Sequence, residues 1–171
     1  LSRVTLGNFL IKRVVFEIQE ELPNIKNFGT LSPIPGFRDW FVNLDEKLVK
    51  NILGNISLEN ISFLKSSSLK IGDTRIISNK NAIYKLVAHY LMNEKNSKQL
   101  PINDVCRFHL GNGAIIDDIV INANISEVGF KRSFGVMVNY LYELKNIEKN
   151  HEEYINKKTT IISNKVKKLI Q

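Results

Sequence analysis

Two segments of the sequence carry a hydroxyl and an imidazole in settings that suit chemistry. Ser32 lies in the string TLSPIPGF at residues 30–37, and His109 lies in FHLGNGA at residues 108–114. The prolines and glycines around them predict turns, where a fold presents side chains to a substrate instead of burying them. The pair therefore indicates an enzyme-like site. Each residue alone also has an ordinary explanation, as a turn-forming serine before proline and as a structural histidine between apolar neighbours.

The other reactive residues do not predict a competing chemistry. Cys106 has no CxxC partner, and the histidines are expected in different elements, so the spacing of metal ligands is lacking. Asp117 and Asp118 fall in a strand-like run, where alternation predicts one exposed acid and one paired acid. We therefore expect neither a metal site nor a carboxylate pair.

The two strings resemble segments of the malonyl-CoA decarboxylase family, in the same order and at a similar separation. Residues 6–15, LGNFLIKRVV, look like the family's glycine-containing loop running into a helix, and residues 134–142, FGVMVNYLY, look like its GLMVNYRY segment. The similarity covers residues 1–143 and stops before the C-terminal helix and basic tail at 144–171. It implies an α/β fold resembling the GNAT acyltransferases, a mixed sheet flanked by helices, of which the chain holds the latter half of the catalytic domain.

The resemblance also assigns roles to individual residues. In the family the residues matching Ser32 and His109 flank the malonyl group, and a tyrosine matching Tyr142 supports them. Asn112, or N–H groups of its loop, would hold the enolate oxygen of the substrate. The loop that binds coenzyme A matches Ser2, Arg3, Val4, Thr5, Leu6, Gly7 and Asn8.

The reaction implied by the resemblance is the decarboxylation of malonyl-CoA to acetyl-CoA and CO2. The thioester carbonyl accepts the charge left by CO2, so no metal or organic cofactor is expected. His109 would deliver a proton to the α-carbon, a task that suits a side chain with an ordinary pKa of about 6.5. Ser32 would orient the carboxylate or take part in the proton relay.

Three alternatives remain open at this point. Gly111 and Leu141 stand where the family usually has arginine. The first alternative is therefore a divergent or remnant member of the family that binds acyl-CoA without decarboxylating it. The second alternative is an acyltransferase of the same fold, and the third is a basic binding module without chemistry.

Composition predicts one globular domain over residues 1–171, because 43% of the residues are hydrophobic. The net charge of +7 is spread along the chain apart from a lysine-rich end, so nucleic acid is not an expected partner. No secretion signal or membrane span is visible, and the single cysteine fits a reducing compartment. We expect a cytoplasmic location, or the mitochondrial matrix in a eukaryote. A sheet edge left uncovered predicts a homo-oligomer or association with an N-terminal part.

Hydrophobic periodicity and turn residues predict an alternating order of helices and strands. The expected elements are a helix from Gly7 and Asn8 to Pro23, a strand over 25–31, a helix beginning at 37–42, short helical turns over 48–70, a helix over 80–93, a sheet-like segment over 105–110, a strand over 114–121, a helix starting at 126–131, a strand over 135–140, and a long helix over 144–170 broken at 159–160.

Overall fold

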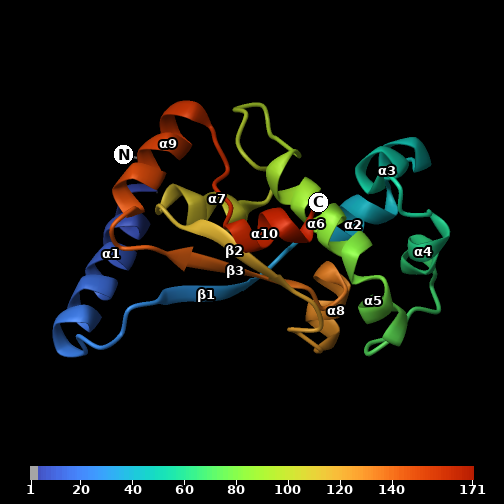
Figure 1. The fold of residues 1–171 in the computed structure, drawn as a ribbon, viewed down its shortest axis with the longest axis horizontal. Coiled ribbons are helices and arrows are strands. Elements are labelled where there is room, and N and C mark those ends of the chain that lie inside the picture. Colours follow the sequence, from blue (N-terminus) through green and yellow to red (C-terminus); the bar gives the residue numbers. More distant parts are fainter. Residues whose placement is uncertain (1–3) are drawn as a thin grey trace.

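The computed structural model describes the backbone of residues 4–171, with the side chains of Ile11 and of Arg13 onward. Helices and strands alternate along it, which confirms the expected α/β class (Figure 1). The elements are α1 Val4–Glu21, β1 Phe28–Pro33, α2 Phe37–Val42, α3 Glu46–Leu53, α4 Glu59–Ser62, the 3-10 helix η1 Phe63–Lys65, α5 Thr74–Ser78, α6 Lys80–Met92, α7 Asp104–Gly111, β2 Ile115–Val120, α8 Glu127–Ser133, β3 Met137–Tyr142, α9 Ile147–Lys157 and α10 Asn164–Leu169.

A three-stranded sheet with the order β1-β3-β2 runs through the middle of the molecule (Figure 1). Both pairings are antiparallel. Phe28 lies opposite Tyr142, and Pro33 lies opposite Met137. Because side chains alternate along a strand, every second residue of β1 shares a face with every second residue of β3. This register places two hydroxyl-bearing residues of β1 beside two tyrosines of β3.

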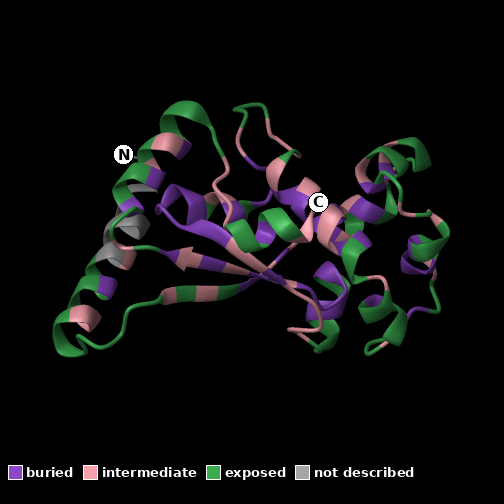
Figure 2. Ribbon diagram, in the orientation of Figure 1, coloured by how far each residue is buried: buried purple, intermediate pink, exposed green. Residues whose placement is uncertain are grey.

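Helices enclose the sheet from both ends. Helices α1 and α9 lie at one end in Figure 1, and α2 to α6 lie at the other. Helix α10 packs against β2. Figure 2 shows buried residues gathered on β2, β3, α6 and α7, with exposed residues on the outer helices. The core therefore lies between the sheet and the helices that connect β1 to β2, chiefly α6 and α7.

Most of the expected elements are confirmed. The helix expected over 80–93 is α6, and the break expected at 159–160 separates α9 from α10. Ser126 begins α8 as a side-chain cap, its hydroxyl accepting from the Gly129 N–H at 3.1 Å. These elements were predictable because their apolar spacing and capping residues favour the same structure as the tertiary contacts.

The first helix begins earlier than expected. Helix α1 already starts at Val4, so Gly7 and Asn8 lie within its first turns instead of before them. The apolar pattern is strong enough to carry a helix through Gly7, whose cost relative to alanine is about 1 kcal/mol. The unpaired backbone N–H groups at the start of the helix then belong to the residues from Val4 onward.

Two further expectations are wrong, and both concern candidate site residues. The strand expected over 25–31 is β1, which runs on to Pro33, so Ser32 lies in a strand and not in a turn. A proline at an outer strand is tolerated because its missing N–H breaks no ladder on the free side. The sheet-like segment expected over 105–110 is helix α7, which Asn103 caps by accepting from the Cys106 N–H at 2.8 Å.

Candidate functional site

Ser32, His109 and Tyr142 form one continuous hydrogen-bonded chain. The Ser32 Oγ lies 3.0 Å from His109 Nε2, and the Tyr142 hydroxyl lies 2.7 Å from His109 Nδ1. The residues come from β1, from α7 and from β3. All three are buried, with 7%, 6% and 2% of their surfaces exposed. The fold thus joins the three residues predicted to be catalytic.

A fourth residue, Thr30, extends this chain. The Ser32 hydroxyl lies 3.3 Å from Thr30 Oγ1, and the two residues are two positions apart on β1. One consistent arrangement has Tyr142 donating to Nδ1, Nε2–H donating to Ser32, and Ser32 donating to Thr30. The reversed arrangement serves equally well, because each hydroxyl both donates and accepts. A proton can therefore be relayed across the imidazole in either direction.

The fifth contributor is Tyr140, which lies against the face of the imidazole. Its ring stacks on His109 with centroids 4.3 Å apart and planes inclined by 18°. Tyr140 lies opposite Thr30 in the sheet and is 1% exposed. Sequence analysis missed both residues, although the alternation of a strand would have placed Thr30 beside Ser32 and Tyr140 beside Tyr142.

Burial sets the protonation of this cluster. It lowers the pKa of His109 to about 4, so the imidazole is neutral at pH 7. It raises the pKa values of Tyr140 and Tyr142 above the ordinary value for tyrosine, so both hydroxyls keep their protons. The resting site is a chain of uncharged groups.

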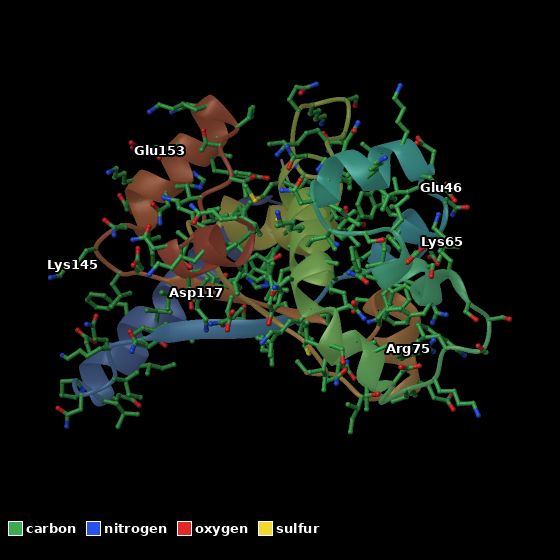
Figure 3. All side chains as sticks on the ribbon, turned by 45° about the vertical axis from the view of Figure 1, so that its right-hand side comes forward. Glu46, Lys65, Arg75, Asp117, Lys145 and Glu153 are labelled. Atoms are coloured by element: carbon green, nitrogen blue, oxygen red, sulfur yellow. The ribbon has the colours of Figure 1, made fainter. Side chains whose placement is uncertain are left out.

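Two hollows border the hydrogen-bonded chain at Tyr142. An apolar pocket of about 440 Å³ lies between α1 and β1, and Thr30 and Tyr142 line it together with Val15 and Ile18. A more polar groove of about 700 Å³ is also lined by Tyr142, together with Glu143 and Lys145. Figure 3 shows Lys145 at the outer margin of the molecule. The hydrogen-bonded chain therefore borders the apolar pocket through Thr30 and both hollows through Tyr142, whereas Ser32 and His109 line neither.

A comparison with known protein families finds a match over the whole sequence. The family model described as the malonyl-CoA decarboxylase C-terminal domain matches residues 1–171. The chain belongs to the malonyl-CoA decarboxylase family.

Curated and solved relatives extend the match. The chain is 34% identical to the mitochondrial malonyl-CoA decarboxylase of Anser anser anser, over 92% of the chain and 35% of that protein. It is 33% identical to that of Mus musculus, over 99% of the chain and 38% of that protein. The crystal structure from Rhodopseudomonas palustris superposes with a TM-score of 0.85 at 36% identity, covering 100% of the chain and 39% of that structure. The structure from Cupriavidus metallidurans gives 0.79 at 34% identity, with 98% and 44% covered. The chain thus spans less than half the length of these relatives.

The remaining predicted site residues of this decarboxylase-family domain are placed differently. Asn112 ends α7 and is 1% exposed, and its amide donates to the Phe108 carbonyl at 2.6 Å while Oδ1 has no partner. It lies one turn from His109 without joining the hydrogen-bonded chain, and its role toward an enolate stays a prediction. Of the predicted coenzyme A loop, Ser2 and Arg3 lie outside the described residues. The backbone of residues 4–8 is helical, and their side chains also lie outside the described part.

Cys106 and the two aspartates have structural roles in this fold. Burial raises the pKa of the Cys106 thiol to about 12, which keeps it protonated and unsuited to nucleophilic attack. Asp118 pairs with Lys165 at 2.5 Å, and Asp117 accepts from the Asn139 amide at 3.3 Å. The expected alternation is wrong because a bulge interrupts the ladder between Ile116 and Asp118, and both acids are half-buried.

Charged residues and possible metal ligands are spread over the part of the chain that the structure describes. Among the residues whose side chains the structure describes, no group of three or more histidine, cysteine or acidic side chains is placed to bind a metal ion. Figure 3 shows Glu46, Lys65 and Arg75 toward one end of the molecule and Lys145 and Glu153 toward the other, so charges of both signs occur at each end. No helix among the described residues is long and apolar enough to cross a membrane.

Replacing Ser32 by alanine should reduce turnover much more than stability. The change removes one partner of the buried imidazole, so we expect about a 100-fold fall in kcat and a stability loss of about 1 kcal/mol. Steady-state kinetics and thermal unfolding measure the two effects. Ser163→Ala is the matched control, because this serine caps α10 and should cost about 1 kcal/mol with unchanged kcat. Equal kinetic effects of the two variants would contradict a role for Ser32 in the reaction.

Protonation of His109 should make the domain less stable in acid. The unfolded histidine has a pKa of about 6.5, whereas burial holds that of the folded one near 4. Between these values the unfolded state binds more protons, so the free energy of unfolding falls as the pH is lowered from about 6.5 to 4. The contribution is complete above pH 6.5. Denaturant titrations across this range should show a shallower fall for His109→Gln, and parallel curves would contradict the expected low pKa.

Proposed function

We propose that this domain decarboxylates malonyl-CoA to acetyl-CoA and CO2 at the Ser32–His109–Tyr142 chain. The observation that supports the proposal most directly is the imidazole bound on both nitrogens, at 3.0 Å by Ser32 and at 2.7 Å by Tyr142. An imidazole held in one orientation by two hydroxyls is prepared to pass a proton at a fixed point. The activity named for the relatives is one that requires a single proton transfer of this kind.

The chemistry needs few groups. The bond between the α-carbon and the carboxylate carbon breaks, CO2 leaves, and the electron pair moves into the thioester as an enolate. A proton then adds to the α-carbon and gives acetyl-CoA. Because the thioester itself accepts the electron pair, the proposed reaction uses neither a metal nor an organic cofactor. The protein has to orient the carboxylate, stabilise the enolate and supply one proton.

His109 is the proposed proton donor, and the substrate itself adjusts its protonation. In the free site its pKa is near 4, so the ring is neutral. A malonyl carboxylate bound beside it would raise that pKa, because a nearby negative charge favours the imidazolium. The proton taken up with substrate is then given to the α-carbon, directly or through Ser32. When CO2 leaves, that negative charge passes to the enolate, and protonation of the α-carbon by the imidazolium removes it.

Substrate would approach from the side of Thr30 and Tyr142. These residues line the apolar pocket between α1 and β1, and Tyr142 also borders the groove that contains Lys145. An apolar pocket next to a polar groove suits a thioester ligand with an uncharged arm and a charged head. Ser32 and His109 are buried next to these residues, in surroundings of low dielectric where the enolate is stabilised more strongly.

The test is incubation of the protein with malonyl-CoA in D2O, with the products followed by mass spectrometry. The proposal expects acetyl-CoA that carries one deuterium and a matching release of CO2, both lost in His109→Ala. Binding of malonyl-CoA without any acetyl-CoA would support the divergent acyl-CoA-binding alternative instead. Transfer of the acyl group to an added amine would support the acyltransferase.

The outer edge of β1 predicts association with another copy of the chain. Among the described residues β1 pairs only with β3, whereas residues 161–163 hydrogen-bond to Ile116 of β2. Leu31 on this edge is 50% exposed, and open edges recruit further strands. Light scattering should show a mass above that of a monomer, reduced by Leu31→Lys. Ile77→Lys is the control, since Ile77 is 55% exposed and belongs to α5, which packs against α6. A monodisperse monomer would contradict the prediction.

The cytoplasmic location expected from the sequence also stays a prediction.

A further inference from the structure

The ring of Tyr140 has contacts that the proposed reaction does not use. It covers one face of His109 at 4.3 Å between centroids, with the planes nearly parallel. Its hydroxyl interacts with Cys106, one turn before His109 on the same helix. Tyr140 therefore contacts α7 at two points, once through its ring and once through its hydroxyl.

The sheet holds Tyr140 rigidly in this place. It lies in the central strand β3, opposite Thr30 on one side and Ile116 on the other. With 1% of its surface exposed it is among the largest fully buried side chains of the described residues. Phe108, the residue before His109, also contacts the imidazole, with its ring edge-on at 5.2 Å between centroids. A ring in such a setting has little freedom to change rotamer.

We propose that Tyr140 is a positioning residue for His109, whose stacked ring keeps the imidazole in the orientation that joins Ser32 to Tyr142. An imidazole has a rotatable bond that tilts both nitrogens at once. A ring packed flat against it removes that tilt and covers one face from water. Both hydrogen bonds of His109 then keep their alignment while substrate enters.

The titratable groups that face the imidazole fit this role. They are Tyr140 and Tyr142 from β3, with Cys106 of α7 behind Tyr140, and burial raises the pKa of each. The Ser32 hydroxyl from β1 completes the surroundings. All of these are neutral at pH 7, so the protonation of His109 responds mainly to how much water reaches the ring.

The test compares Tyr140→Phe, which keeps the stack, with Tyr140→Leu, which removes it. NMR titration follows the His109 ring protons, assigned by their loss in His109→Gln. In the unchanged protein and in Tyr140→Phe, the ring current of residue 140 should shift these protons upfield, and His109 should titrate far below 6.5. In Tyr140→Leu the upfield shift should vanish, and the pKa should rise by about one unit or more. For turnover, kcat should fall about 10- to 100-fold in Tyr140→Leu, with KM changed less than about twofold.

A second stack in the same chain supplies the control. Trp40 lies over His89 with centroids 6.0 Å apart and planes inclined by 20°. Trp40→Leu should change the His89 signals and leave those of His109 and kcat unchanged. A loss of kcat in Trp40→Leu equal to that in Tyr140→Leu would show general loosening and overturn the proposal.

Other outcomes would also overturn it. One is a wild-type His109 without an upfield shift, and another is a Tyr140→Leu titration equal to the wild type. A third is equal effects of the Phe and Leu variants, which would assign the role to the hydroxyl. Should Tyr140→Leu not fold, Tyr140→Met replaces it under the same criteria.

The catalytic consequence of the stack rests on the proposed function, but the titration needs no substrate. Absence of malonyl-CoA turnover with the expected titrations would reject the proposed function alone. Normal turnover with an unshifted His109 would reject the positioning role alone.

Discussion

Replacing His109 by alanine is expected to lower malonyl-CoA turnover by about 100- to 10,000-fold, with little change in the affinity for substrate. The imidazole is the one group of the buried chain that can take up a proton when a carboxylate binds beside it and raises its pKa. Its neighbours Ser32 and Tyr142 hold their protons and would remain without a donor between them. The loss should therefore fall on kcat, measured by acetyl-CoA formation, while the dissociation constant of malonyl-CoA from calorimetry stays within a few-fold.

The control for this prediction is His89→Ala. His89 lies on α6, is half-buried and stacks on Trp40, so its removal costs an aromatic contact without touching the site. We expect turnover close to that of the unchanged protein. If His109→Ala lost binding and rate to the same extent, or if both variants lost activity alike, His109 would be a structural histidine.

Replacing Gly113 by alanine should destabilise the domain by about 3 kcal/mol or more. Gly113 has a φ of 80°, a left-handed conformation that costs other residues about 1 to 2 kcal/mol. An added Cβ would also overlap the carbonyl oxygen of Ile147 at the start of α9 and lie 2.9 Å from its carbonyl carbon. These are backbone atoms, so α9 itself would have to shift. Thermal unfolding should show a midpoint lower by about 6 to 12 °C.

Gly72 offers a matched control for the backbone contribution alone. Its φ is 79°, and an added Cβ there would meet nothing within 4 Å. Gly72→Ala should cost about 1 to 2 kcal/mol. The difference between the two variants measures the overlap with Ile147. Similar losses in both would show that the turn after α7 yields easily and that α9 is not held against it.

Part of the site was predictable from the sequence because its chemistry is local. Ser32 and His109 stand out by residue type, in strings whose neighbours resemble one family, and Tyr142 follows from the same resemblance. Helix α6 was equally predictable, since its apolar residues recur at helical spacing over 13 residues. For these features the residue types alone carry enough information, and the tertiary contacts agree with them.

The sequence by itself determined the reactive groups, the family and the α/β class, and the tertiary structure decided how those groups meet. Short apolar runs such as residues 105–110 do not distinguish a strand from a helix, so α7 was settled by its cap and by packing. Ser32 and His109 are separated by 77 positions, and the register of β1 on β3 brings Ser32, Thr30, Tyr140 and Tyr142 to one face beneath that helix. The low pKa of His109 and its stack on Tyr140 arise from burial and non-local contact. These properties depend on distances between segments remote in sequence, which only the folded chain fixes.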